Sequence, residues 1–562
     1  MFISFIDRLG EFNPQLFREI KGRFKPFSVL VAVASSLLIQ LVIFLYQLQS
    51  FPGEEYPIYG EYCQLNIRNQ IYSSEVGNCP LNKIDFTLWW RDHWEYAFLS
   101  LSVIFVFALI VGGTYLLISD LAKEENRGTL NFIRLSPQSE TSILIGKLLG
   151  VPSLIYLFVI TAIPFHLLAG RSAKIATSYI LAYYAILAAS CLFFYSAALS
   201  FGLVSRVFSS FQPWLGSGAV LLFLFITMTI AGSYSGNYIN NPTTFFRLLA
   251  PWDMINYLFP NLFKSYPQTP ILELKFFGLA VGKNFSLLFA FNIVNYGICS
   301  YAIWQAMKRC FRNPNATIIN KKQSYLLVTA TQIMFWGLTL SEVKTHNDVA
   351  LLFIIGFLNA FIILSLIFIL SPQRQTIIDW GRYRHQNHKG TNIWQDLIFG
   401  EKSPSSLAIL INLVIAYVPL IIWFSLADDK FFKYNLTDFT SIASVALFMT
   451  LIIIYATVTQ LLLMLKTQKR YIWAIGTLSA LIILPPLILS ILGMYPREEN
   501  ALIWLFSTFP WPALEFVDPL AVFTALLGHL SIIALFNYQL HKQVKVLGES
   551  ATKAILAGRE VI

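Results

Sequence analysis

Long apolar runs alternate with short polar segments along the whole chain, and this pattern predicts the fold. An α-helix needs about 20 apolar residues to cross the hydrocarbon core of a bilayer, and twelve runs approach that length. We therefore expect an all-α, multi-pass membrane protein with about twelve transmembrane helices. The predicted spans are Phe27–Leu48, Ala97–Ser119, Leu148–Ala169, Ala176–Gly202, Trp214–Gly232, Ser286–Met307, Tyr325–Leu340, Ala350–Leu370, Ser405–Leu426, Ser441–Leu465, Tyr471–Met494 and Leu520–Leu540.

The N-terminal residues 1–26 carry an amphipathic pattern instead of a span. Apolar side chains recur every four residues from Phe12 to Phe24, and basic side chains occupy the opposite face. Asn13 and Pro14 suit the cap and the first turn of a helix. We expect this helix to lie in the membrane interface, with its apolar side towards the acyl chains.

The charges predict the orientation of the spans. Hydrophobic residues make up 56% of the chain and charged residues only 12%, which excludes an ordinary water-soluble protein. With the N-terminus inside, 27 of the 40 Lys and Arg fall in cytoplasmic segments. We expect both termini in the cytosol of a bacterium whose inner (plasma) membrane holds the protein. The net charge of +10 then indicates contact with anionic lipids and cytosolic partners, not nucleic acid.

Weak internal repeats predict two fused six-helix halves, residues 27–312 and 313–562. Ser-Pro turns at Ser136-Pro137 and Ser403-Pro404 open the third span of each half. Each half also has a semi-apolar segment broken by prolines, which we expect to form re-entrant or interfacial helical pieces on the outer side. These segments are Phe245–Phe263, with Pro251-Trp252, and Leu505–Val517, with Pro510-Trp511. The first half has a long outside loop (49–96), and the second has a longer cytoplasmic loop (371–404) and a basic C-terminal tail.

The polar segment 120–147, between the second and third spans, carries the most specific motif. Glu125-Asn126-Arg127-Gly128-Thr129-Leu130 is followed by Leu135-Ser136-Pro137, and Lys147 ends the segment. It resembles the cytoplasmic loop of ABC-2-type ABC transporter permeases, which docks into a cleft on a separate ATPase subunit. Asn131 stands where the family usually has Glu. The N-terminal helix is similar to the elbow helix of that family.

Two other interpretations of this segment stay open. One is an ordinary solvated connection between spans. The other is the loop between helices 2 and 3 of major-facilitator carriers. Asp120 and Gly128 are faintly similar to residues of that loop, but this chain lacks the Arg-Arg pair with which the loop ends.

The resemblance implies which residues couple the permease to its ATPase. In the first half these are Glu124, Glu125, Arg127, Gly128, Thr129, Leu130, Ser136 and Pro137. A weaker counterpart in the second half comprises Glu401, Lys402, Ser403 and Pro404.

The chain lacks the Gly-x-x-x-x-Gly-Lys-Ser/Thr phosphate loop, so we do not expect it to be an enzyme. ATP and Mg²⁺ would be bound by the partner ATPase. Other expected partners are membrane lipids and a second copy or a second permease subunit. His166 and His529 each stand alone, and we assign no catalytic, cofactor-binding or metal-binding residue.

Cys63 and Cys79 share the first outside loop. A disulfide is expected if that loop faces an oxidising compartment, and two free thiols are the alternative.

The resemblance implies the permease subunit of an ATP-driven exporter, and it leaves the substrate open. The alternatives are a secondary carrier with six plus six helices, driven by an ion gradient, and a membrane-embedded transferase or scaffold. An ion-driven carrier usually needs acidic residues at the bilayer midplane. A transferase would need clustered Asp, Glu or His side chains on a face that water reaches.

Overall fold

The computed structural model describes residues 10–548 except 59, 65–77, 206–210, 233–238, 264–269, 315, 341–347, 387–391, 427–437, 468 and 498. Helices form nearly all of the regular structure in this part of the chain, which otherwise contains only three isolated β-bridges. Among the described residues, eleven helical segments are long and apolar enough to cross a membrane. The expected all-α, multi-pass architecture is confirmed. Residues 1–9 and the end of the basic C-terminal tail lie outside the described residues.

The seventh predicted span does not reach the apolar character of the others. Residues there form helix α14 (Lys321–Thr339), but it is not among the eleven. Gln332 in this helix is 5% exposed and donates to Asn359 Oδ1 over 2.7 Å, and Asn359 donates to the Ala416 carbonyl over 3.1 Å. Because protein groups satisfy the buried amide of Gln332, α14 can pack against its neighbours without a fully apolar surface.

The chain divides into two compact units. The first comprises residues 1–239, 246–274 and 280–312, and the second comprises residues 240–245, 275–279 and 313–562. The helices of the first unit are α2 (Pro14–Arg23), α3 (Pro26–Leu48), η1 (Leu81–Lys83), α4 (Phe86–Val106), η2 (Phe107–Gly112), α5 (Gly113–Asn126), α6 (Thr129–Arg134), α7 (Glu140–Gly150), α8 (Ser153–Ser172), α9 (Thr177–Val204), α10 (Gln212–Gly232), α12 (Trp252–Leu258), η5 (Pro260–Phe263), η6 (Pro270–Glu273), η7 (Val281–Lys283) and α13 (Phe285–Arg312).

In the described part of the second unit, α14 is followed by nine further helices, which are membrane spans or shorter helical pieces. They are α15 (Asp348–Leu370), α16 (Arg374–Gln386), α17 (Ile393–Phe399), α18 (Ser406–Leu426), α19 (Asp438–Leu463), α20 (Arg470–Ile491), α21 (Ala501–Trp504), η9 (Trp511–Phe516) and α22 (Pro519–Gly548). The short helix α11 (Thr244–Arg247) spans the boundary between the residues of the two units.

The second predicted span is much longer than its apolar run. Residues Phe86–Asn126 form one helical stretch, α4, the π-helical η2 and α5. In the π-helical turn, the Leu109 carbonyl accepts a hydrogen bond from the Tyr195 hydroxyl over 2.7 Å. The helix therefore continues past the membrane-depth residues and carries its polar end, from Asp120 to Asn126, away from them.

The third predicted span is split into two helices. α7 ends at Gly150 and α8 begins at Ser153, with Pro152 between them. Proline lacks the N–H that would continue the ladder of α7, so the break falls there. Lys147 consequently lies on the separate helix α7, before the membrane-spanning α8 begins.

The broken segments form short helices, as their prolines suggest. Pro251 precedes α12 and Pro510 precedes η9, each with a helical backbone conformation. Their tryptophans differ, because Trp252 is fully buried and donates to the Leu224 carbonyl over 2.8 Å, whereas Trp511 is 37% exposed.

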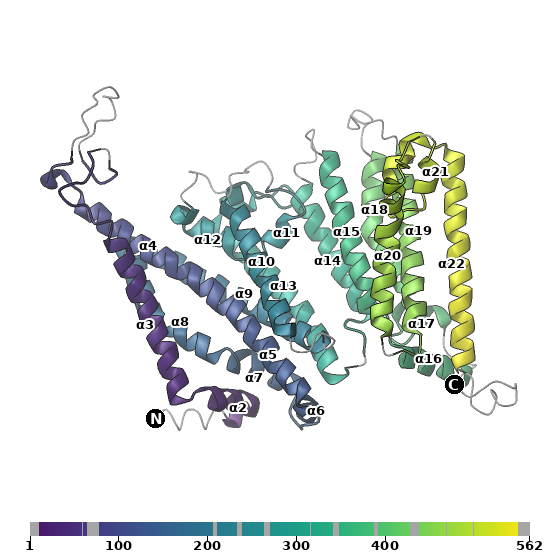
Figure 1. Cartoon of the computed structure of the whole chain (residues 1–562), viewed down its shortest axis with the longest axis horizontal. Helices are drawn as coiled ribbons and strands as arrows, with labels where there is room; N and C mark the ends of the chain where they lie inside the picture. The colour runs from purple at the N-terminus through teal and green to yellow at the C-terminus, as the bar shows by residue number, and fades with distance from the viewer. Residues whose placement is uncertain are drawn as a thin grey trace. The chain divides into compact units, whose positions relative to one another are not determined.

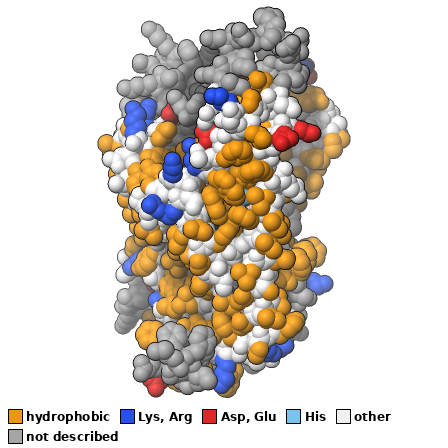
Figure 2. Space-filling view, turned by 90° about the vertical axis from the view of Figure 1, so that its left-hand side faces the viewer, with side chains coloured by type: hydrophobic (Ala, Val, Ile, Leu, Met, Phe, Trp, Pro, Cys, Tyr) orange, Lys and Arg blue, Asp and Glu red, His pale blue; other side chains and the backbone are white. Residues whose placement is uncertain are grey.

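The outer surface of α3 is apolar. Exposed large side chains include Leu30, Leu38 and Tyr46, and the face of the molecule on this side carries a broad hydrophobic area (Figure 2). Side chains of this kind suit contact with acyl chains.

Candidate functional site

The predicted coupling segment folds as a helix–turn–helix–turn–helix unit. α5 ends at Asn126, α6 covers Thr129–Arg134, and α7 begins at Glu140 after the Ser136-Pro137 turn. Figure 1 places α2, α6 and α7 at the same end of the first unit, away from the loop that holds Cys63 and Cys79. Ser139 caps α7 by accepting from the Ser142 N–H over 3.2 Å.

Gly128 makes the first turn. Its φ is +71°, a left-handed conformation in which only glycine is unstrained. The Gly128 N–H donates to the Glu125 carbonyl over 3.0 Å, which ends α5, and α6 starts at the next residue. The Thr129 hydroxyl donates to the Glu124 carbonyl over 3.2 Å and closes the same turn.

α6 has one buried face and one exposed face. Leu130 and Ile133 are 2% and 5% exposed, whereas Phe132 and Leu135 are 78% and 85% exposed. The buried pair anchors the helix to the unit. The exposed pair presents large apolar side chains at a position where a solvated loop would carry polar ones.

A buried ion cluster holds the helices on both sides of α6. The side chain of Lys147 is fully buried, and its Nζ lies 2.6 Å from Asp120 Oδ2, 2.7 Å from Glu124 Oε2 and 3.6 Å from Glu19 Oε1. Burial alone lowers the pKa of Lys147, but the charges of the three carboxylates outweigh it and raise the pKa above its ordinary value. Lys147 is therefore held as an ammonium ion that joins α2, α5 and α7.

Two arginines of α2 complete the cluster. Arg18 pairs with Glu124 and Arg23 pairs with Asp120, both at 2.6 Å. Three carboxylates therefore face three cations, all within or next to the α2–α5–α7 contact. The N-terminal helix is thus fastened to the helices that flank the coupling segment.

The backbones of α2 and α7 approach closely at two glycines. A Cβ atom on Gly146 would lie 2.8 Å from the Leu16 nitrogen, and one on Gly150 would lie 2.5 Å from the Glu19 Cβ. Asn13 reinforces the contact, because its side chain accepts from the Leu16 N–H over 3.0 Å and donates to the Ser142 carbonyl over 2.8 Å. This packing brings Glu19 within reach of Lys147.

The three carboxylates of Glu19, Asp120 and Glu124 come close enough to suggest a metal site, with ligand oxygens within 4.8 Å of one another. Lys147 Nζ, however, lies within 3.6 Å of an oxygen of each. A cation bound there would have to displace a buried ammonium and face two arginines. The cluster is therefore better described as an ion-pair network than as a metal centre.

The predicted coupling residues of the first half have different environments. Arg127, Gly128, Thr129 and Pro137 are exposed, and Glu125 and Ser136 are partly exposed. Glu124 forms ion pairs with Lys147 and Arg18, and the side chain of Leu130 lies on the buried face of α6.

The predicted counterpart in the second half surrounds another lysine. Glu401 and Lys402 are exposed, but Ser403 and Pro404 are buried. Lys321 Nζ donates to the Ser403 hydroxyl and the Leu397 carbonyl over 2.7 Å, and to the Pro404 carbonyl over 3.0 Å. Burial lowers the pKa of Lys321 to about 7, against the opposing charge of Asp396. The Ser-Pro turn here binds a side chain of its own unit.

The sequence analysis did not predict the ion cluster or the exposure of Phe132 and Leu135. Glu19, Asp120 and Lys147 are far apart in the sequence, and no spacing rule connects them. Phe132 and Leu135 lie within the motif segment, and their apolar character next to charged residues was the available signal.

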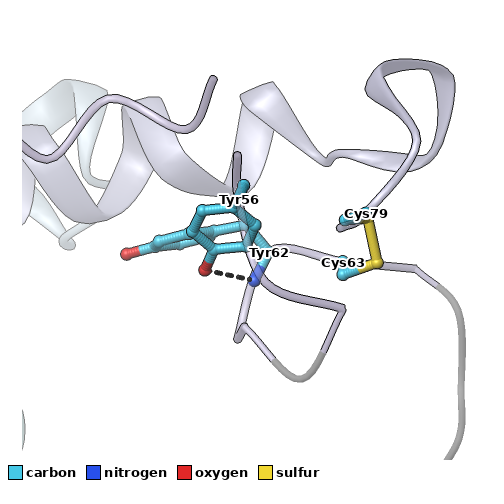
Figure 3. The surroundings of a disulfide bond; sticks show 4 residues. All are labelled: Tyr56, Tyr62, Cys63 and Cys79. Carbon is cyan, nitrogen blue, oxygen red and sulfur yellow. Dashed lines mark hydrogen bonds between the residues drawn. A yellow bond between two sulfur atoms is a disulfide. The ribbon is translucent and has the colours of Figure 1, made fainter. Parts of the chain in front are cut away.

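Cys63 and Cys79 are joined by a disulfide with a Cα–Cα distance of 6.0 Å (Figure 3). Next to it, the Tyr62 N–H donates to the Tyr56 hydroxyl over 3.3 Å. The bond closes the chain segment between these two cysteines, in which residues 65–77 lie outside the described part of the chain.

Comparison with known proteins identifies a family for more than half of the chain. Residues 5–308 match the family described as ABC-2 family transporter protein. No curated protein and no solved structure matches the chain.

Proposed function

Because the chain belongs to the ABC-2 family of transporter proteins, we propose that it is the permease subunit of an exporter driven by a separate ATPase chain. A permease of this family is the transmembrane subunit of an ABC transporter and is not itself catalytic. In this proposal ATP and Mg²⁺ bind to the partner, and the present chain supplies the pathway and the coupling surface.

The observation that carries the coupling role is the exposure of Phe132 and Leu135. Phe132 on the anchored six-residue helix α6 and Leu135 directly after it are 78% and 85% exposed, and a protein partner would bury such large apolar side chains. Arg127 and Thr129 lie beside them as the polar rim. We assign Phe132 and Leu135 to the centre of the ATPase contact and leave Leu130 as the anchor beneath it.

The ion cluster supports transmission of movement from this contact. Because Lys147 ties α5 and α7 to α2, a displacement of α6 would move these helices together. α5 continues directly into the membrane-spanning stretch Phe86–Asn126. A movement of the partner at the cytoplasmic end would therefore reach membrane depth through a continuous helix.

Orientation is part of the proposal. We place α6 and both termini in the cytosol and the disulfide-bearing loop outside, in a bacterial inner membrane. The excess of basic residues in the inward segments and the position of the disulfide at the opposite end of the unit support this arrangement.

The test is co-purification of the chain from its native membrane with its ATPase. Phe132→Asp and Leu135→Asp should each abolish the association while the protein still inserts and elutes normally. Asn131→Asp, at an exposed polar position on the same helix, is the matched control and should retain the partner. Normal ATPase association in both apolar variants would contradict the docking role.

Transport and labelling assays test the remaining parts. Transport should stop when ATP is depleted, and transport that survives this but collapses with an ion gradient would indicate a secondary carrier. A cysteine introduced at Asn131 should react with thiol reagents only from the cytosolic side. Reaction from the outside would reverse the proposed orientation.

A further inference from the structure

The second unit contains a cavity of about 630 Å³ among α16, α17, α18, α19 and α22. This volume is in the usual range of small-molecule sites, about 300–1,000 Å³. Its wall follows α22 from Leu530 to Val544, about 21 Å of α-helix at 1.5 Å per residue. The cavity therefore runs from the middle of a membrane-spanning helix to its C-terminal end.

Apolar side chains line the part at membrane depth. Ala446, Met449 and Ile453 on α19 and Leu410 on α18 form this wall together with Leu530. A long apolar wall inside a bundle of spans suits a hydrocarbon chain better than a polar solute.

The other end of the cavity carries polar groups. Trp380, Asn537 and His541 line it there. The indole N–H of Trp380 is buried and has no acceptor among the described residues. A buried donor without a partner is uncommon, and an oxygen of a bound ligand would satisfy it.

The short helix α17 at this end of the cavity suits a position at the membrane surface. Ile393 and Trp394 on α17 are 44% and 62% exposed, and both line the cavity. Tryptophan is enriched at the headgroup level of bilayers, where its ring is apolar and its N–H can bind an acceptor.

The same end is positively charged. α16, α17 and the end of α22 together carry five Lys and Arg against two Asp, and one of these, Asp396, pairs with Arg384 at 2.8 Å. Arg382 on α16 and Lys542 and Lys545 on α22 are exposed on helices that contribute other residues to the cavity lining. These cations complement an anionic group at the cavity mouth.

We propose that this cavity binds one acyl chain of an anionic phospholipid from the surrounding membrane, with an ester or phosphate oxygen accepting the Trp380 N–H. The lipid headgroup then lies near the exposed cations of α16 and of the end of α22. The site is built from the second unit alone, and the inference goes beyond the proposed function because it holds whether or not an ATPase binds α6.

The experiment uses the full chain in nanodiscs with a phosphatidylglycerol probe that carries a photoreactive diazirine near the end of one acyl chain. Peptide mapping should place the label on the stretches of α19 and α22 that line the cavity. Ala446→Trp should fill the cavity and lower this labelling roughly tenfold, equivalent to about 1.4 kcal/mol. Leu535→Trp, on the 62% exposed surface of α22, is the matched control and should leave it unchanged.

Equal labelling of the cavity peptides in Ala446→Trp and wild type would overturn the chain-binding site, as would label confined to exposed surfaces. If Ala446→Trp fails to fold, Met449→Phe tests the same wall with a smaller change. Trp380→Phe keeps the ring but removes the donor, and should also weaken labelling.

A comparison of two lipids tests whether the site prefers an anionic headgroup. A phosphatidylcholine probe with the same acyl chain should label the cavity less than phosphatidylglycerol does. Lys542→Gln with Lys545→Gln should remove the difference. Equal labelling by the two lipids in the wild type would overturn the anionic preference.

Discussion

Lys147 on α7 and Asp120 on α5 are joined by an ion pair of 2.6 Å that lies beneath the coupling segment. The two residues stand at the two ends of the polar segment, and the pair closes it into a compact unit. Glu19 brings α2 to the same ammonium ion. These ion pairs fasten α5 and α7, the helices on either side of α6, to α2.

Replacing Lys147 should be strongly destabilising. Lys147→Met leaves three carboxylates without their shared buried cation, and removal of one partner from such a network costs about 3–5 kcal/mol. Lys123→Met, at an exposed position on α5, should have little effect. Thermal unfolding of the purified chain measures both, and equal unfolding temperatures would show that the network contributes nothing.

Gly150 should not tolerate a side chain. In Gly150→Ala the new Cβ would meet the Glu19 Cβ at 2.5 Å, so α2 must move away from α7, at a cost of about 1–3 kcal/mol. Gly22→Ala is the control within α2, because a Cβ there meets nothing within 4 Å. That variant should gain up to about 1 kcal/mol from higher helix propensity. Denaturation curves that show the same change for both variants would exclude close packing at Gly150.

Gly128→Ala tests the turn between α5 and α6. The cost should be about 1–2 kcal/mol, because φ is +71° while the space around the position is open. Gly128→Asn should cost less, since Asn tolerates this conformation better. The readouts are unfolding and retention of the ATPase. If Ala and Asn behave alike, backbone strain is not what selects glycine here.

Stability should depend on pH through Lys321. Its pKa is lowered to about 7 in the folded chain, against about 10.4 for an unperturbed lysine. Between these values the unfolded state binds more protons than the folded state, so stability should rise as pH increases from about 7 to about 10.4, by at most about 1.4 kcal/mol per pH unit.

Lys321→Met should flatten this part of the stability profile. Denaturation at several pH values, with the variant and the wild type compared side by side, measures the difference. Profiles of equal slope would mean that Lys321 remains charged at its three oxygen acceptors in the folded chain.

Local sequence patterns predicted most of the membrane architecture. Apolar runs such as Phe27–Leu48 correspond closely to helices, here α3, because partition into a bilayer depends on the summed hydropathy of consecutive residues. α14 is the instructive exception, because polar groups such as Gln332 and Asn359 satisfy one another only after packing. For a similar reason, the motif did not show which of its side chains are buried, such as Leu130, and which are exposed, such as Arg127.

The sequence by itself determined that the chain is helical, multi-pass and equipped with a Gly128-bearing polar segment of a recognisable type. Hydropathy and left-handed turns are properties of neighbouring residues, so they can be read from one stretch. Tertiary structure alone decided that Leu130 faces inward while Phe132 faces out, and that Lys147 meets Glu19, Asp120 and Glu124. Those contacts depend on how separate helices pack, because charges distant in the chain interact only when folding brings them within a few ångströms and removes the water between them.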